Sequence, residues 1–332
     1  MEHKCIIAVL GATGYIGGRL VPTLLERNWS VRAVGRNLEK LRCRPFATHP
    51  GIELTQADAL DRTALTTALR GCHAVYYLVH SMYPGVGNFE DRDKRAAEIM
   101  RDAAADAGLQ RIIYLGGLGD DAPDLSLHLK SRMEVGRILG SGPAALTWLR
   151  AAMILGSGSA SFEILRYLVD RLPIMITPAW VKSLCQPIAV TNVLEYLAGC
   201  LDHPETMGRT FDIGGPDILS YRDLFDVYAR VAGLRRRIII PVPVLTPRLS
   251  SYWIQLVTPV PSSLSRPLAE GLRNKVVCRE NSIRDIIPTR LLSAEEAISR
   301  ALDRTGRHEV ETCWSDAGAV RVPEWADCGD AP

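Results

Sequence analysis

The sequence predicts an α/β fold, a doubly wound parallel sheet with a smaller C-terminal lobe, and three observations support this prediction. Short β-rich runs alternate with helical patterns through the first half of the chain, which is typical of parallel strands joined by crossover helices. An apolar run at residues 5–10 leads directly into a glycine-rich turn at residues 11–17. After residue 150 the regular alternation fades, and this change indicates a second lobe.

Apolar β-rich runs predict the strands, and a period near 3.6 residues predicts the helices. Strands are expected at residues 5–10, 30–35, 52–56, 74–79, 111–115 and 146–149. Helices are expected at residues 15–27, 61–69, 91–107, 131–139, 193–201 and 224–232. Pro22 falls inside the first helix and is expected to bend it. A last helix is expected near residues 293–304, where Ser293 and Glu296 form a capping-box pattern.

These patterns divide the chain into a sheet domain at residues 1–155, a C-terminal lobe at 156–305 and a tail at 306–332. Periodicity is lost after Gly306, and the end from Asp316 is expected to be loosely attached. The proline-punctuated segment around residues 249–257 has two interpretations. It is either a cap helix packed on its own domain or a helix that lies on a membrane surface.

Composition limits the classes of protein to which the chain can belong. A hydrophobic content of 47% with 23% charged residues is typical of a globular protein, and a net charge of +2 gives no general attraction to nucleic acid. The eight cysteines are scattered without a C-x-x-C pair, so we expect reduced thiols and no metal site. No apolar run reaches the length of a transmembrane span. We expect a soluble cytoplasmic protein, with peripheral membrane contact left open.

The glycine-rich turn predicts a dinucleotide site of the Rossmann type. Gly11 permits the tight turn, Gly14 lets the backbone approach a pyrophosphate, and Gly17 lets the following helix pack closely on the strand. The helix N-terminus offers free N–H groups and a positive dipole end to the phosphates. The turn residues that we expect to contact the cofactor are Gly11, Thr13, Gly14, Tyr15, Ile16 and Gly17.

Arg36 favours NADP over NAD, with NAD still possible. The end of the second strand meets the adenosine ribose, where an acidic residue selects NAD and an arginine accommodates the 2′-phosphate of NADP. The run at residues 31–36 contains no acidic residue and ends in Arg36, although Glu39 is close enough in sequence to oppose this preference. The alternative is that Arg36 is an ordinary exposed arginine.

Asp58, Val79 and His80 follow the next two strands. Asp58 is placed to accept a hydrogen bond from the adenine amino group, or else it caps the following helix. The strand tip at Val79 and His80 is expected to pass under the nicotinamide ribose. His80 has two interpretations, a core histidine and a group of the site.

Several further motifs resemble one group of proteins. They are LVHSM at 78–82, YLGGLG at 114–119, HLKSR at 128–132, GSGSASFE at 156–163 and GGP at 214–216. With the strand, the glycine turn and Arg36, they resemble the atypical and extended short-chain dehydrogenase/reductases. More narrowly, the chain is similar to bacterial NAD(P)H-binding proteins related to the 39 kDa subunit of complex I and to NmrA-like proteins.

The resemblance implies a catalytic set that this chain lacks in part. Enzymatic members use a serine after the fifth strand and a Tyr-x-x-x-Lys pair on the next helix. Here the serine position is occupied by Gly116 and Gly117, the tyrosine position by His128 and the lysine position by Arg132. Histidine can exchange protons near neutral pH, and arginine keeps a positive charge for the ribose. The alternative for His128 is an ordinary surface residue before a helix.

The resemblance also implies a role for the C-terminal half, which is expected to cover the nicotinamide. Segments near residues 186–215 are expected to return to the sheet edge. The glycine- and serine-rich stretch at residues 156–162 is either a pocket-lining loop or simply a flexible one.

Three functions are compatible with these residues. The first is an NADPH-dependent reductase of a small carbonyl or quinone-like compound, with His128 as proton donor and Arg132 on the ribose. The second is a non-catalytic redox sensor or assembly factor of the NmrA-like kind, which acts on a protein partner. The third is a nucleotide-sugar epimerase or dehydratase, which the missing tyrosine and lysine disfavour.

Overall fold

The computed structural model describes residues 5–80, 89–119, 125–242, 257–316 and 318. Its centre is a sheet in which seven strands run parallel in the order β11-β6-β5-β4-β1-β2-β3. These strands are β1 (Ile6–Leu10), β2 (Ser30–Gly35), β3 (Ile52–Gln56), β4 (Cys72–Tyr77), β5 (Arg111–Gly117), β6 (Ala145–Ala151) and β11 (Thr210–Ile213). The predicted doubly wound parallel sheet is confirmed. Strand order reverses between β1 and β4, and such a switch point opens a crevice at the carboxyl ends.

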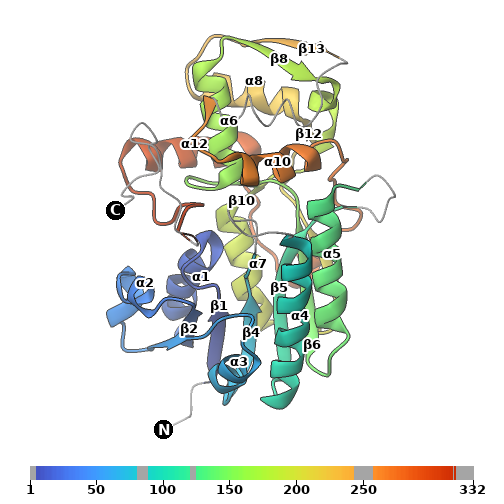
Figure 1. Cartoon of the computed structure of the whole chain (residues 1–332). Coiled ribbons are helices and arrows are strands. Elements are labelled where there is room, and N and C mark those ends of the chain that lie inside the picture. The colour runs from blue at the N-terminus through green and yellow to red at the C-terminus, as the bar shows by residue number, and fades with distance from the viewer. Residues whose placement is uncertain (1–4, 81–88, 120–124, 243–256, 317, 319–332) are drawn as a thin grey trace.

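Helices cover both faces of this sheet (Figure 1). On one face, α1 and α7 form an apolar cluster with the strands, in which Leu20 and Leu197 are fully buried. On the other face, Leu65, Met100 and Leu139 come from α3, α4 and α5. These helices are α1 (Tyr15–Glu26), α3 (Arg62–Leu69), α4 (Phe89–Asp106), α5 (Leu127–Gly140) and α7 (Val190–Asp202), with the short α2 (Leu38–Arg42) beside β3. Helix α1 continues through Pro22.

The C-terminal lobe stands over the carboxyl edge of the sheet (Figure 1). Its helices are α6 (Ala160–Arg171), α8 (Tyr221–Val231), α10 (Ser262–Gly271), α11 (Ile283–Ile286) and α12 (Ala294–Gly306). Its strand pairs are β7 (Ile154–Leu155) with β10 (Ile188–Ala189), β9 (Leu184–Cys185) with β12 (Leu219–Ser220), and β8 (Ile174–Pro178) with β13 (Ile238–Val242). Short 3-10 helices lie at Pro45–Thr48, Ala179–Lys182 and Pro204–Thr206. Because β11 pairs with β6, the C-terminal half of the chain returns to the sheet.

Three element boundaries near the crevice differ from the sequence-based expectation. Strand β4 ends at Tyr77 instead of residue 79, so the next residues form the loop that follows it. Helix α5 starts at Leu127 instead of residue 131, because Ser126 caps it by accepting a hydrogen bond from the N–H of Leu129. Helix α6 starts at Ala160, inside the stretch expected to be a loop, and Ser159 caps it in the same way.

The segment between α12 and Asp316 is packed on the first helix of the sheet domain. After α12, the segment at residues 309–316 runs back to α1. Thr312 Oγ1 donates to the carbonyl oxygen of Tyr15 and accepts from Arg19 Nε, both at 2.8 Å, and Trp314 is buried. Polar bonds and the buried Cys313 and Trp314 therefore hold this segment without an apolar repeat. The loosely attached end that is expected from Asp316 lies, beyond Asp316 and Gly318, outside the described residues.

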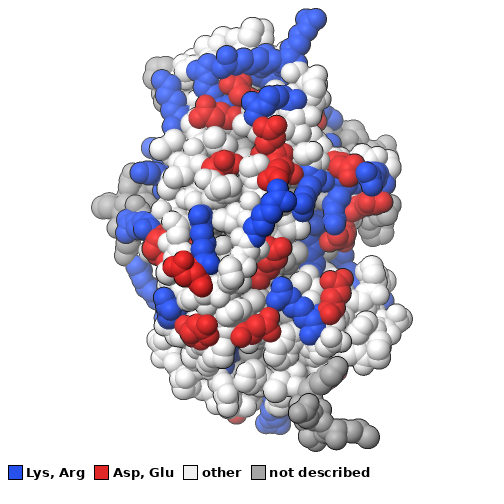
Figure 2. Space-filling view, turned by 180° about the vertical axis from the view of Figure 1, so that it is seen from behind, with Lys and Arg blue, Asp and Glu red and all other residues white. Residues whose placement is uncertain are grey.

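The capping box of α12 is confirmed, since Ser293 and Glu296 exchange both hydrogen bonds. In the part of the chain that the structure describes, no helix combines the length and apolar character needed to cross a bilayer. Of the helix expected at residues 249–257, residues 249–256 lie outside the described residues. Figure 2 shows basic and acidic side chains intermingled over the face opposite to that of Figure 1.

Candidate functional site

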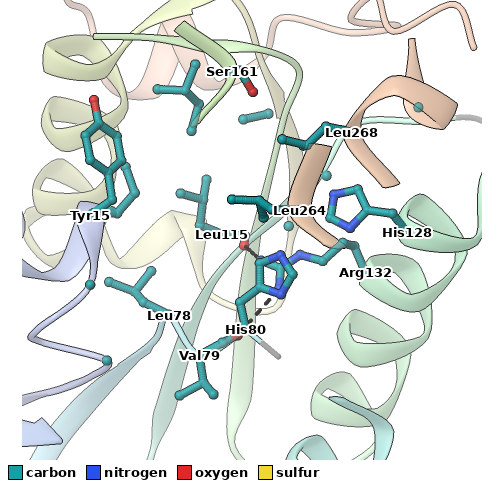
Figure 3. Close-up of a pocket in the computed structure, with 18 of the residues that line it drawn as sticks. Tyr15, Leu78, Val79, His80, Leu115, His128, Arg132, Ser161, Leu264 and Leu268 are labelled. Carbon is teal, nitrogen blue, oxygen red and sulfur yellow. Dashed lines mark hydrogen bonds between the residues drawn. The ribbon is translucent and has the colours of Figure 1, made fainter. Parts of the chain in front are cut away.

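A cavity of about 490 Å³ lies between the carboxyl ends of the central strands and the C-terminal lobe (Figure 3). Every residue for which the sequence predicts a binding or catalytic role lines it. They are Gly11, Thr13, Gly14, Tyr15, Ile16, Gly17, Arg36, Asp58, Val79, His80, His128 and Arg132. They come from five separate segments of the chain, and the parallel sheet brings them to one edge.

The glycine-rich turn requires glycine at two positions. Gly11 has a φ of 95°, and a Cβ added there would stand 2.9 Å from the carbonyl oxygen of Leu78, beyond the end of β4. A Cβ on Gly17 would stand 2.2 Å from the carbonyl oxygen of Gly11, so α1 packs directly on the turn. This close packing leaves the first N–H groups of α1 at the cavity, where an anion would be stabilised.

Arg44 supports the turn from outside, and sequence reasoning missed it. Its Nη2 donates to the carbonyl oxygen of Thr13 at 2.6 Å. The same guanidinium pairs with Asp316 of the C-terminal segment at 3.0 Å. No local pattern could have revealed this role, because the arginine and the carboxylate are far apart in sequence.

The adenosine end of the cavity contains Arg36 and Asp58. Asp58 accepts from the N–H of Leu60 at 2.9 Å, whereas the cap of α3 is Asp61, which accepts from the N–H of Ala64. The interpretation of Asp58 as a helix cap is therefore wrong. Glu39, which was expected to oppose an NADP preference, is exposed and pairs with Arg42 at 2.6 Å outside the cavity lining.

Two histidines meet at the other end of the cavity. The rings of His80 and His128 lie nearly parallel, 14° apart in orientation, with centroids separated by 5.5 Å. His128 extends from α5 toward the cavity (Figure 3), and its buried Nδ1 has no hydrogen-bond partner within the described structure. Burial, with a contribution from the Arg132 charge, lowers the pKa of His128 to about 3. Burial, Arg132 and His128 likewise hold the pKa of His80 well below its usual range. Both imidazoles are neutral at pH 7.

Behind His80 stands a buried carboxylate. His80 Nδ1 is 3.8 Å from Oδ2 of Asp93 on α4, and Ser131 Oγ donates to the same oxygen at 3.4 Å. Asp93 is 3% exposed, so little water screens it from the ring. The carboxylate therefore sits on the side of His80 away from solvent and can fix the orientation of the imidazole.

Arg132 ties two strand ends together. Its guanidinium donates to the carbonyl oxygen of Leu115 at 2.6 Å and to that of Val79 at 3.5 Å (Figure 3). It also lies over the ring of Tyr114, with 5.1 Å between the guanidinium carbon and the ring centroid. An arginine has five N–H donors, so these carbonyl contacts leave donors for a ligand.

A side chain at the serine position would press on its neighbours. A Cβ on Gly117 would stand 2.8 Å from Cδ2 of Leu129, and one on Gly116 would stand 2.4 Å from Nε1 of Trp148. A hydroxyl at this place would require neighbouring side chains to move. The site therefore differs from the serine-containing arrangement by packing as well as by residue type.

The parallel sheet, the glycine-rich turn and this cavity define a dinucleotide-binding protein of the doubly wound α/β class. Residues 11–154 match the model of the NAD(P)H-binding family. Their match covers the glycine-rich turn, the strand tips and α5, which are the parts that line the dinucleotide side of the cavity. NAD(P)H binding by this domain is thereby confirmed.

Relatives of known name agree with this class. The chain is 32% identical over 124 residues to cinnamoyl-CoA reductase 1 of Oryza sativa subsp. japonica, which covers 35% of this chain and 36% of that protein. It is 24% identical over 247 residues to the mitochondrial NADH dehydrogenase [ubiquinone] 1 alpha subcomplex subunit 9 of Arabidopsis thaliana, covering 72% of this chain and 61% of that one. The match thus spans about a third of the first relative and less than two thirds of the second.

Solved structures share the fold. A triphenylmethane reductase of Citrobacter sp. complexed with NADP(H) superposes with a TM-score of 0.70 at 18% identity, over 89% of this chain and 99% of that one. An NADPH-dependent quinone oxidoreductase of Escherichia coli complexed with NADPH superposes with a TM-score of 0.70 at 19% identity and the same coverage. The expected resemblance to the complex I subunit is confirmed in sequence, and these NADPH-binding reductases share the fold.

Proposed function

We propose that this protein is an NADPH-dependent reductase of a carbonyl or quinone-like compound. The observation that carries the proposal is His128 Nδ1, a buried polar atom without a protein partner, in the cavity that begins at the dinucleotide turn. Buried polar atoms in native proteins are almost always paired, so an unpaired one in a cavity points to a ligand oxygen. The names of the two structural neighbours, a dye reductase and a quinone oxidoreductase, are in line with this proposal.

NADPH is the preferred cofactor in this proposal. Arg36 lines the cavity at the end of β2, where a 2′-phosphate would lie, and the carboxylate of Glu39 is paired elsewhere. Asp58 is free of a capping role and lines the same end, where it would accept from the adenine amino group.

The cofactor, when bound, supplies the hydride that reduces the substrate carbon. His128 is neutral at pH 7 because its pKa is lowered to about 3. With the hydrogen on Nδ1, it would donate a hydrogen bond to the substrate oxygen and stabilise the negative charge that develops there. Water would then supply the proton that completes the alcohol or hydroquinone. This is a change from the expected role of His128 as the proton donor itself, because a neutral imidazole is a poor acid.

Arg132 would act beside His128 by holding the strand ends and by offering its remaining donors to the ribose hydroxyls. Its fixed positive charge also keeps both imidazoles neutral. Without a serine hydroxyl at Gly116 or Gly117, the substrate oxygen would receive one side-chain donor fewer than in serine-containing relatives. We therefore expect modest turnover.

NADPH oxidation with menadione tests the proposal in the His128→Phe variant. Loss of a single donor to a developing oxyanion should lower kcat about 10²–10³-fold and leave the NADPH dissociation constant unchanged. The exposed histidine His73, which lies outside the cavity lining, supplies the matched control His73→Phe. An unchanged rate in His128→Phe would overturn the proposed role of this residue.

One observation favours a second function, a redox sensor that acts on a protein partner. The closed serine position at Gly116 and Gly117 removes a group that fast relatives use. A sensor would bind NADPH without oxidising it in the presence of any quinone or aldehyde. It would also bind its partner with different affinity in the NADP⁺ and NADPH forms, and this difference separates the two functions.

A further inference from the structure

The C-terminal lobe contributes a wall of different chemistry from the rest of the cavity. The lining residues after Ala152 are Met153, Ile154, Ser161, Ile164, Leu165, Leu168, Tyr221, Leu224, Phe225, Leu264, Leu268, Ala269, Gly271, Leu272 and Val276. Within this described part of the lining, only Ser161 and Tyr221 carry a polar side-chain atom. None of these residues carries a charge.

The wall is built from three helices. Leu165 and Leu168 come from α6, Leu224 and Phe225 from α8, and Leu264 and Leu268 from α10. Leu264 and Leu268 are one helical turn apart and so share a face of α10. In Figure 3, Leu264 and Leu268 are drawn in the same part of the cavity lining as Leu115, His80 and His128.

All charged side chains of the described lining lie in the first 132 residues. They are Arg36, Asp58, Arg92 and Arg132. The first two lie where the adenosine is expected, and Arg92 belongs to α4 of the sheet domain. Arg132 already contacts two strand-end carbonyls. A phosphate or carboxylate of a substrate would therefore find no cation among the described lining residues that the lobe contributes, and beside these residues it would lose its hydration without compensation.

We infer that the substrate is an uncharged carbonyl or quinone compound with a hydrocarbon substituent of several carbons, which lodges between α6, α8 and α10. The inference rests on the proposed function and narrows it, because the apolar wall would bind such a tail while the histidines face the reacting oxygen. Apolar burial strengthens binding about fourfold per methylene at best. The apolar wall disfavours nucleotide sugars as substrates, because their diphosphate would meet no cation among the described lining residues of the lobe.

Two quinones with one headgroup test the inference. They are 2,3-dimethoxy-5-methyl-1,4-benzoquinone and the same ring with a decyl tail. With NADPH, we expect the tail to lower KM at least tenfold with a smaller change in kcat. With NADP⁺ bound no hydride is available, and calorimetry should show a dissociation constant at least tenfold lower for the decyl compound.

The binding measurement separates the proposed reductase activity from the inferred apolar substrate site. Tail-dependent binding without any turnover would remove the reductase proposal and leave the apolar site in place. Turnover with equal KM values and equal dissociation constants for the two quinones would overturn the inference alone. A quinone whose decyl tail ends in a carboxylate should bind no more tightly than the quinone without a tail. If it binds as tightly as the decyl compound, the inference is also overturned.

Leu268→Glu places a charge in the wall. The KM values of the two quinones, which should differ at least tenfold in the unmodified protein, should differ twofold or less in this variant. If that variant does not fold, Leu268→Trp fills the same space and should reduce the difference by steric exclusion. The control is Leu127→Glu, because Leu127 is a leucine of α5 with 54% exposure outside the lining. A difference that persists in both Leu268 variants would overturn the inference.

Discussion

Arg44 Nη2 lies 2.6 Å from the carbonyl oxygen of Thr13, so a residue beyond α2 holds the middle of the glycine-rich turn. The carboxylate of Asp316 pairs with the same guanidinium, and Lys40 Nζ donates to the backbone carbonyl oxygen of Asp316 at 3.4 Å. The segment after α12 therefore braces the turn that we expect to receive the pyrophosphate.

This brace predicts that Arg44→Ala weakens cofactor binding without touching the cofactor. Loss of a partly buried charge-assisted bond costs about 1.5–3 kcal/mol. Part of this cost should be a less ordered glycine-rich turn in the variant. We expect NADPH to bind roughly tenfold more weakly by fluorescence titration. Arg42→Ala is the matched control, since Arg42 is exposed and pairs only with Glu39 in the described structure. Equal affinities in the two variants would show that the brace does not matter.

Arg36→Ala should discriminate between the two nicotinamide cofactors. The contact to a 2′-phosphate is worth about 1.5–3 kcal/mol, so NADPH affinity should fall by roughly 10- to 150-fold while NADH affinity changes little. Titration of both cofactors against the Arg36→Ala variant measures the two affinities. The control is Arg70→Ala, a change at an exposed arginine. If the unmodified protein binds NADH as tightly as NADPH, the preference for NADP is wrong.

Gly14→Val should abolish binding of either cofactor and leave the fold intact. Gly14 has a φ of −81° and a ψ of 176°, an extended conformation open to any residue, and it lines the cavity where the pyrophosphate is expected. Circular dichroism and cofactor titration check the two halves of this prediction. In the control Gly306→Val, an added Cβ meets nothing within 4 Å. Cofactor affinity retained in folded Gly14→Val would place the phosphates elsewhere.

Stability should fall as the solution is acidified below pH 6.5. The pKa of His128 is about 3 in the folded protein and near 6.5 in the unfolded chain, so only the unfolded chain takes up this proton between these values. The unfolded state is thus favoured by about 1–2 kcal/mol between pH 7 and pH 5. Urea denaturation at both pH values should show this loss, and His128→Phe should reduce it. A loss that is equal in His128→Phe and His73→Phe would contradict the assignment to His128.

The local sequence was sufficient for six of the seven strands of the sheet and for the dinucleotide turn. The strands β1, β2 and β3 coincide with their expected runs to within one residue, because a buried parallel strand needs a short apolar run with a sharp end. The turn from Gly11 to Gly17 was predictable for the same kind of reason, since its backbone path leaves no space for side chains at either end.

The boundaries around the site were less predictable, because side-chain caps decide them. Ser126 begins α5 four residues before the apolar period does, and Ser159 begins α6 inside a stretch rich in glycine and serine. The role of Asp58 was ambiguous because Asp58 and Asp61 both precede α3, and only the geometry shows which one caps it.

The sequence by itself determined that this protein has a doubly wound sheet and a dinucleotide turn, because both follow from patterns within a few neighbouring residues. Only the tertiary structure decided what stands at the far end of the cavity. His80 meets His128, Arg132 binds two strand ends, and three helices from distant parts of the chain close an apolar wall over them. These relationships join residues far apart in sequence, and the burial that makes both histidines neutral exists only after the chain has folded.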